Sequence, residues 1–264
     1  NLLARADRPW FVYTHLMDVH DCRSSSRPLR LVYRLKFLPR WLSARRRKLT
    51  TRRFLYDAAL MDIDEQLQRI LDTLHRTNQL DNTVIIVTGD HGNQYAASPR
   101  DGKKELGFRT HYEDIDVPLI LSGGPDLADN GDLIDSMGVA ATLLDILNIS
   151  PHESFKGISA YQGGRKFVVS ENAGRGNADL HLRDLYFTVT TASQKLMARL
   201  TGDVLEPCEF YDLSNDPKEL INRVNDAACA KDISRLVSAL WVERESLLSA
   251  RRAQDPRAPN TASA

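Results

Sequence analysis

The sequence has few cysteines and no long apolar run. Its three cysteines, Cys22, Cys208 and Cys229, lie far apart with no CxxC spacing, which excludes a cysteine-rich zinc module and a disulfide scaffold. No apolar stretch approaches the roughly 20 residues that a transmembrane helix needs. Lysine plus arginine equals aspartate plus glutamate, at 35 each. The formal net charge is therefore zero and indicates no class of partner, and we expect no nucleic-acid partner.

Acidic residues are absent from one long segment of the chain. Residues 22–56 contain twelve lysines and arginines and no aspartate or glutamate. Such a segment can attract a polyanionic substrate or an anionic membrane surface, but we favour a solvated insertion. We expect the RRRK run at residues 45–48 to be exposed and to take no part in a metal site. The reason is that no carboxylate lies nearby in the sequence to offset the desolvation of four cations.

Helix and strand patterns alternate through the first half of the chain, which is typical of an α/β fold. Apolar residues recur every three or four positions in residues 54–76 and 137–147, which predicts two helices. Unbroken apolar runs predict strands at residues 10–16, 83–88 and 117–121. The run at 83–88, TVIIVT, is typical of a central parallel strand covered on both faces. We therefore expect a mostly parallel sheet flanked by helices.

The pattern changes after residue 166, where short β-branched and apolar runs are separated by Gly, Asn and Asp. These runs, at residues 167–169, 185–191 and 195–200, predict a smaller antiparallel sheet. Apolar spacing at residues 233–249 predicts a helix that packs against it.

We divide the chain into three parts on this basis. Residues 1–165 form the carboxyl-side part of an α/β domain, and residues 166–252 form a smaller α+β subdomain. The Pro/Ala/Asn/Ser-rich residues 253–264 form a tail that we expect to be disordered. The chain opens at Asn1, without an initiator methionine, and enters an apolar segment within ten residues. We therefore expect a fragment whose upstream part is missing, so its start indicates no compartment.

The most specific chemical feature is the sequence Gly89-Asp90-His91-Gly92 at the end of the 83–88 strand. In open α/β sheets, ligands bind outside the carboxyl ends of the strands. A carboxylate beside an imidazole is a suitable pair of ligands for a divalent metal. The flanking glycines allow a sharp turn and close backbone approach. A polar strand-to-loop turn without function is the competing interpretation.

Two further groups of polar residues also follow predicted strands or precede one. His20 ends the sequence Met17-Asp18-Val19-His20, where it can donate to an anionic oxygen or act as a general acid. A cationic loop before the 117–121 strand can stabilise charge on a transferring sulfuryl or phosphoryl group. Its members are Lys103, Lys104, Arg109 and His111. A structural histidine and a solvated charge run are the competing interpretations.

The order of these motifs resembles the sulfatase family of the alkaline-phosphatase superfamily. The resemblance covers residues 10–225, with every motif in the family's order. The motifs that carry it are MDVH at 17–20, DNTVIIVTGDHG at 81–92, YEDIDVPLIL at 112–121, ATLLDIL at 141–147, FKGIS at 155–159 and FYDLSNDPKEL at 210–220. The family's fold agrees with the α/β prediction.

The resemblance implies roles for individual residues. Asp90 and His91 match the family's late pair of metal ligands, and His20 matches a histidine that contacts the sulfate. The family also has a lysine, or in related branches a histidine, shortly before the YE…VP strand. Spacing does not select one residue for this role. Three candidates remain: Lys103, which best fits the distance from Asp90; Lys104; and His111, which is nearest the strand.

The chain also departs from the family's pattern. Members bind their metal with two further aspartates near the amino terminus, and their nucleophile is a formylglycine made from Cys or Ser in C/S-x-P-x-R. Neither feature precedes the MDVH motif in this sequence, where the family has both; Ser26-Arg27-Pro28-Leu29-Arg30 has the C/S-x-P-x-R spacing but follows that motif. Residues 22–27, CRSSSR, have Ser at the two places where Pro and Arg belong, and they follow the MDVH motif instead of preceding it. We therefore expect a carboxyl-terminal part of a sulfatase, inactive by itself, with the nucleophile segment upstream.

The resemblance therefore implies a metal-dependent sulfuric ester hydrolase acting on a sulfated small molecule or a sulfated glycan. The metal implied by the resemblance is calcium, with Mg, Mn and Zn as alternatives. A phosphoesterase or phosphoethanolamine transferase of the same superfamily, with a Thr or Ser nucleophile, is the first rival. A non-catalytic relative that keeps only the fold is the second. The upstream sequence would distinguish the three hypotheses.

Overall fold

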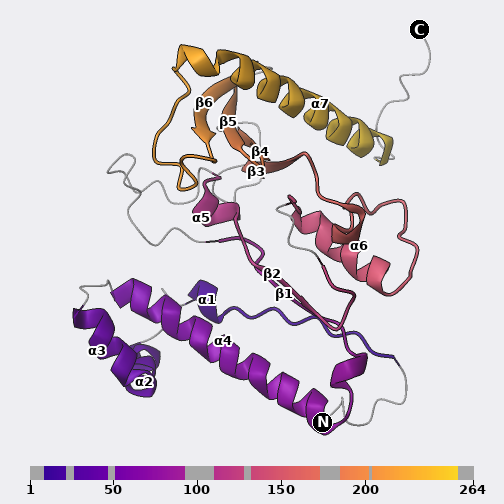
Figure 1. Cartoon of the computed structure of the whole chain (residues 1–264). Helices are drawn as coiled ribbons and strands as arrows, with labels where there is room; N and C mark the ends of the chain where they lie inside the picture. Colours follow the sequence, from indigo (N-terminus) through magenta and orange to yellow (C-terminus); the bar gives the residue numbers. More distant parts are fainter. Residues whose placement is uncertain are drawn as a thin grey trace. The chain divides into compact units, whose positions relative to one another are not determined.

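The computed structural model of the chain forms two compact units, Asn1–Ile85 and Ile86–Ala264 (Figure 1). The first unit is built from helices, and the second carries both sheets. No helix in the described part of the chain is long and apolar enough to cross a bilayer. The residues that the structure describes are 9–21, 27–46, 51–92, 110–127, 132–172, 185–201 and 204–254.

The first unit is built around the long helix α4 (Thr51–Arg76), which confirms the helix predicted at residues 54–76. Helices α1 (Asp18–Asp21) and α2 (Arg27–Lys36) contact α4, and α3 (Leu38–Arg46) contacts α2. One apolar cluster holds these helices together. Its buried members are Tyr33, Phe37, Phe54, Leu55, Ala58 and Ala59.

Part of the basic segment is paired with the acidic side chains of α4. Lys36 hydrogen-bonds to Asp62 and lies 2.7 Å from a Glu65 carboxylate oxygen; these contacts raise the pKa of the Lys36 ammonium. Arg53 donates to Asp57, one turn further along the helix, at 3.0 Å. Arg46 is exposed, as expected, while the side chains of its neighbours at 45, 47 and 48 lie outside the described residues. The partners of this segment therefore come from the helix that follows it.

The strand predicted at residues 10–16 is wrong, because these residues are irregular. Phe11 and Tyr13 are 73% and 78% exposed. The indole N–H of Trp10 donates to the side-chain oxygen of Gln79, just beyond α4, at 3.1 Å. A strand needs a neighbour for its backbone hydrogen bonds, and no strand precedes β1 among the described residues. Apolar, β-branched composition alone does not provide that neighbour.

The smaller sheet pairs β1 (Ile85–Thr88) with β2 (Leu119–Ser122), so both predicted strands are confirmed. The 3₁₀ turn η2 (Leu80–Asn82) leads into β1. Burial on both faces was also predicted for residues 83–88, and this is wrong: β1 is half-buried, and Ile120 on β2 is 57% exposed. The described part of the sheet gives β1 a single paired neighbour, so its apolar side chains are only partly covered.

Two helices accompany this sheet in the second unit. The single turn α5 (Tyr112–Ile115) precedes β2. Helix α6 (Ser136–Ile146) matches the helix predicted from apolar spacing, and its N-cap Asp135 accepts a hydrogen bond from the Gly138 N–H at 2.8 Å. Such a cap satisfies an otherwise unpaired amide of the first helical turn. Helix α6 packs against the 3₁₀ turn η3 (Ala160–Gln162).

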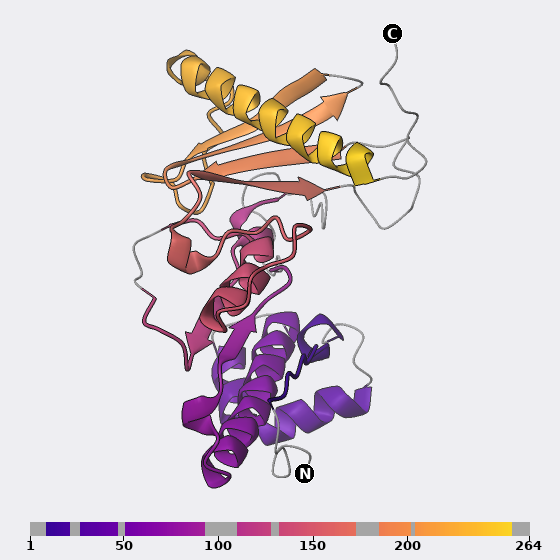
Figure 2. The same cartoon turned by 90° about the vertical axis from the view of Figure 1, so that its right-hand side faces the viewer.

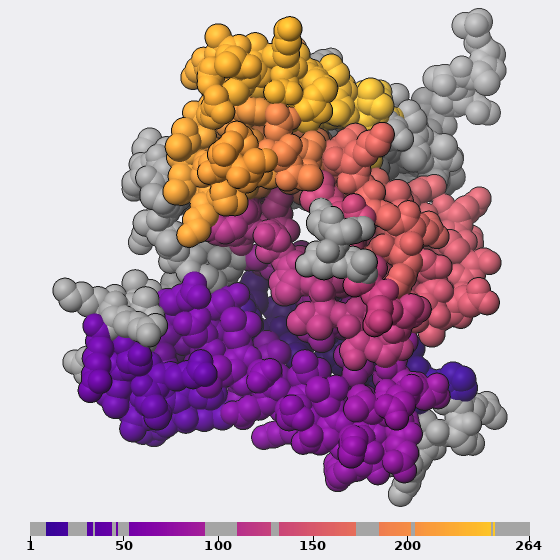
Figure 3. Space-filling view, in the orientation of Figure 1, coloured from indigo at the N-terminus to yellow at the C-terminus, as the bar shows by residue number. Residues whose placement is uncertain are grey.

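The predicted antiparallel sheet and its covering helix are both present. The strands are β3 (Phe167–Asn172), β4 (Leu185–Thr191), β5 (Gln194–Thr201) and β6 (Val204–Asp212), in the order β3-β4-β5-β6 with every pair antiparallel. Helix α7 (Ala230–Gln254) lies across one face of this sheet (Figure 2). In the space-filling view, the yellow atoms of α7 adjoin the orange atoms of the residues that precede it in the sequence (Figure 3). The shared core includes Val189, Leu196, Phe210, Leu236 and Leu240.

Candidate functional site

Asp90 and His91 lie just beyond the carboxyl end of strand β1. The Asp90 carboxylate accepts the backbone N–H of His91 at 2.9 Å, which holds the aspartate over its own turn. The two side chains lie side by side, with Asp90 Oδ2 3.8 Å from His91 Nε2. They are 71% and 60% exposed, respectively. Both are therefore available to a ligand from solvent.

The geometry of His91 leaves one ring nitrogen free to act as a metal ligand. Its Nδ1 lies 2.7 Å from the carbonyl oxygen of Gly92, and because a carbonyl only accepts, Nδ1 carries the proton. The lone pair is then on Nε2, the atom beside Asp90. Metal–nitrogen and metal–oxygen bonds together span about 4.5 Å, so donors 3.8 Å apart can reach one ion.

By itself this pair could supply only part of a metal site. No group of three or more His, Cys, Asp or Glu side chains in the described part of the chain is placed to hold an ion. Asp90 and His91 fit a divalent cation by donor type and by separation, whereas the remaining ligands would have to be water or other groups. By donor type and placement, the arrangement could supply one part of a metal site at the end of a strand.

Gly92 connects this loop to α5. Its N–H donates to the Asp114 carbonyl at 2.7 Å. A Cβ at this position would lie 2.1 Å from the Glu113 carbonyl oxygen, so glycine is required for the close approach. Gly89, at the start of the turn, would place a Cβ 3.3 Å from the Val117 side chain, a much milder contact. The position of His91 therefore depends on where α5 lies.

His111 is buried immediately before α5 and faces the antiparallel sheet. It is 5% exposed, and its Nε2 lies 2.9 Å from Glu209 Oε2. The Tyr211 hydroxyl donates to the same carboxylate oxygen at 2.5 Å, and the two rings meet edge to face. His111 Nδ1 has no hydrogen-bond partner among the described residues. Thr110, also buried, hydrogen-bonds to Thr188 on β4.

A second buried contact holds α5 from the same side. Glu219, 1% exposed, pairs with Lys195 of β5 at 2.7 Å. Its other carboxylate oxygen accepts the backbone N–H of Tyr112 at 3.2 Å. No role was expected from sequence for Lys195, Glu209, Tyr211 or Glu219. Tyr211 and Glu219 belong to the FYDLSNDPKEL motif, which was the one sequence signal that could have indicated a role for them.

The other predicted site residues are not brought together by the described structure. His20 is exposed at the end of α1, in the first unit. Lys103, Lys104 and Arg109 lie outside the described residues. The substrate-binding roles of these residues stay predictions.

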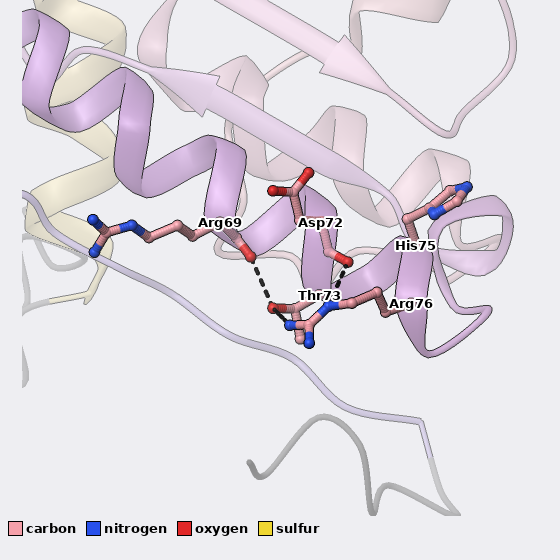
Figure 4. Close-up of a pocket in the computed structure, with 5 residues that line it drawn as sticks. All are labelled: Arg69, Asp72, Thr73, His75 and Arg76. Carbon is pink, nitrogen blue, oxygen red and sulfur yellow. Dashed lines mark hydrogen bonds between the residues drawn. The ribbon is translucent and has the colours of Figure 1, made fainter.

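A shallow hollow on α4 contains none of the predicted residues. It is lined by Arg69, Asp72, Thr73, His75 and Arg76 at the carboxyl end of that helix (Figure 4). These side chains bond within the helix: Thr73 donates to the Arg69 carbonyl at 2.8 Å, and Arg76 donates to the Asp72 carbonyl and the Thr73 hydroxyl. Polar groups already satisfied by their own helix do not indicate a ligand site.

A family model described as Sulfatase matches residues 1–149, which is more than half of the chain. A curated relative, choline-sulfatase of Rhizobium meliloti (strain 1021), is 27% identical over 174 residues. That alignment covers 63% of this chain and 32% of the relative. The chain thus spans about a third of the length of this relative.

Two solved structures agree with this fold. A 2-O GAG sulfatase superposes with a TM-score of 0.62 at 21% identity, covering 97% of this chain and 58% of that chain. A phosphonate monoester hydrolase from Silicibacter pomeroyi superposes with a TM-score of 0.61 at 22% identity, covering 74% and 41%. At such identities the likeness establishes the fold alone, and it agrees with the α/β architecture described above.

Proposed function

The chain belongs to the sulfatase family, and from this premise we propose that it supplies metal-binding and anion-binding residues of a sulfuric ester hydrolase. The observation that carries the proposal is the placement of Asp90 and His91 side by side at the end of β1. Both lie within the region that matches the family. The similarity to choline-sulfatase supports the same reaction class.

Asp90 Oδ2 and His91 Nε2 would hold a divalent ion, which when bound supplies positive charge to sulfate oxygens and to a nucleophile. The family resemblance favours calcium, which takes six or more ligands, mostly oxygen. An imidazole is a more usual ligand for Zn, so Zn stays an alternative, with Mn and Mg. The nucleophile would be a formylglycine, and no C/S-x-P-x-R precedes the MDVH motif, where the family makes one.

The anion-binding roles in this proposal belong to cationic and imidazole groups. His20 would donate a hydrogen bond to a sulfate oxygen, and Lys103 or Lys104 would neutralise charge that develops on the leaving oxygen. His111 is 5% exposed and engaged with Glu209, so we assign it no contact with substrate. Fixed charges near the reacting atoms act without reorganisation during the reaction.

The substrate that we propose is a sulfated glycan or a small sulfate ester. The similar structure named as a 2-O GAG sulfatase supports the glycan class, and the choline-sulfatase relative supports a small ester. The phosphonate monoester hydrolase structure keeps a phospho-ester hydrolase as the second candidate. The two candidates differ in which tetrahedral anion the site prefers.

The test is anion binding by the isotopically labelled chain, followed by NMR, with and without calcium. Inorganic sulfate and inorganic phosphate are the probes, so the result does not require a complete enzyme. We expect sulfate to shift the signals of Asp90, His91 and His20 only when calcium is present. Phosphate should cause smaller shifts at the same concentration.

Asp81→Ala is the control variant for the anion-induced shifts. It removes an exposed carboxylate from η2 and leaves the turn after β1 intact. Stronger binding of phosphate than of sulfate would favour the phospho-ester hydrolase. If neither anion shifted these signals in the presence of metal, the proposed function would be wrong. Steady hydrolysis of a chromogenic aryl sulfate by this chain would show that a nucleophile lies within it.

A further inference from the structure

The buried ion pair of Lys195 and Glu219 lies in the second unit, next to Tyr112, the first residue of α5. Both side chains are almost fully buried, at 2% and 1% exposure. Burial of two charges carries a large desolvation penalty, and well-packed apolar residues often stabilise a fold equally well. Stability alone is therefore a weak explanation for this pair, and its contacts suggest another.

Glu219 makes two contacts at once. One carboxylate oxygen pairs with Lys195 Nζ at 2.7 Å, and the other accepts the Tyr112 N–H at 3.2 Å. The backbone of Glu219 has a φ of 54°, which is uncommon for a residue with a side chain. Lys195 thus holds the carboxylate in place, and the carboxylate holds the first residue of α5.

A short chain of hydrogen bonds continues from Tyr112 to the candidate metal loop. Within this turn, Asp114 N–H donates to the His111 carbonyl at 2.9 Å. The carbonyl of Asp114 then accepts the Gly92 N–H at 2.7 Å. Gly92 in turn presents its own carbonyl to His91 Nδ1 at 2.7 Å. All of these hydrogen bonds lie within the second unit.

His111 provides a second attachment at the neighbouring position. Its imidazole reaches Glu209 on β6 at 2.9 Å, and Tyr211 holds the same carboxylate. Consecutive residues of the loop are therefore held by two different carboxylates, both supplied by residues after position 200. Two attachments fix the orientation of α5 as well as its position.

We propose that Lys195, Glu219, Glu209 and His111 are positioning residues that set the orientation of His91 through α5. This inference rests on the proposed function, because it assigns a purpose to the geometry of the same proposed metal site. The antiparallel sheet then acts as the rigid support of that site. His111, a candidate for substrate contact by family resemblance, has its role in this support.

The experiment compares two double variants that remove the buried charges but differ in one acceptor. Lys195→Met/Glu219→Gln keeps an oxygen that can accept the Tyr112 N–H, whereas Lys195→Met/Glu219→Leu has none. Both replace the ion pair with neutral groups of similar size, so neither leaves an unpaired buried charge. The readout is amide hydrogen exchange at Tyr112 and Gly92, measured by NMR.

We expect the Leu variant to exchange these two amides about tenfold faster than the Gln variant, the effect of losing one net hydrogen bond. Amides of β4 and β5 should exchange alike in the two variants. The His91 ring signals should shift in the Leu variant and return toward wild type in the Gln variant. Arg199→Met is the control, since Arg199 forms an exposed pair with Glu206 on the same sheet at 3.0 Å.

Equal exchange at Gly92 in both double variants would overturn the inference, as would faster exchange spread evenly over the sheet. If the Leu variant fails to fold, the Gln variant alone still tests the inference, because its Gly92 amide should stay as protected as in the wild type. Calcium titration of the wild type separates the two proposals. Calcium binding by the wild type, together with equal Gly92 exchange in the two double variants, refutes the positioning role. No calcium binding, together with faster Gly92 exchange in the Leu variant, refutes only the metal site.

Discussion

At the scale of single residues, Gly92 has little freedom to change. A Cβ there would lie 2.1 Å from the Glu113 carbonyl, so Gly92→Ala must move the loop or α5. We expect the free energy of unfolding to fall by about 1–3 kcal/mol, as for overpacked sites. Gly89→Ala, with its nearest contact at 3.3 Å from a side chain, should cost clearly less. Urea unfolding of both variants tests the difference, and equal losses would contradict it.

The two cysteines that the structure describes should differ in reactivity. Cys229 is buried, and burial raises the pKa of its thiol, so the reactive thiolate is scarce at neutral pH. Cys208 is only half-buried. We expect iodoacetamide to label Cys208 several-fold faster than Cys229 in the folded protein and at similar rates in urea. Mass spectrometry of the labelled peptides measures both, and faster labelling of Cys229 would count against this packing.

Asp226 should make stability depend on pH. Hydrogen bonds from Arg223 and from the Ala228 N–H lower the pKa of its carboxyl below 3.8. A lowered folded-state pKa adds stability above the unfolded pKa, and this stability is lost as the pH falls through the folded value. We expect Asp226→Asn to lower the melting temperature at pH 7 and to have little effect near pH 2. A constant difference across this range would contradict the prediction.

At the scale of elements, α7 stabilises the second unit through one apolar face. Leu236 is 1% exposed in the core beneath the helix, whereas Val242 on the same helix is 71% exposed. We expect Leu236→Ala to lower the free energy of unfolding by about 2–5 kcal/mol. Val242→Ala should change it by less than about 0.5 kcal/mol, as at other exposed positions. Similar losses in the two variants would show that α7 does not cover the sheet.

Elements with a strong internal period could be predicted from the sequence. Helices α4, α6 and α7 and strands β3 to β5 were found near their predicted positions. Strand β6 was not predicted, because Glu206, Pro207 and Glu209 interrupt its apolar alternation; β6 lies at the edge of the sheet, where Pro is tolerated. Residues 10–16 show the opposite case, in which strand-like composition has no strand to pair with.

The candidate site could be predicted only where its parts are close in sequence. Asp90 and His91 are adjacent, so a single strand end places both. His111 and Glu209 are 98 positions apart, and their meeting depends on the register of β6 and on the path of the loop before α5. Sequence patterns carry no information on such a meeting, so the buried supports of the site became visible only in the structure.

At the scale of the whole molecule, we propose that the chain carries one part of a metal site. It spans about a third of the length of its choline-sulfatase relative, and its described residues offer two donors where calcium needs six or more ligands. No C/S-x-P-x-R precedes the MDVH motif in the sequence, where the family has its nucleophile. We therefore expect the chain by itself to bind metal weakly and not to hydrolyse an aryl sulfate.

The most direct test of the central claim is calorimetric titration of the chain with calcium, beside Asp90→Ala. We predict a dissociation constant of about 10⁻³ M or weaker for the wild type, in the range of the weakest protein calcium sites. Asp90→Ala should abolish the binding heat and keep the melting temperature, because Asp90 is 71% exposed. Equal binding heat in the two proteins would contradict the assignment of Asp90 and His91 as metal ligands.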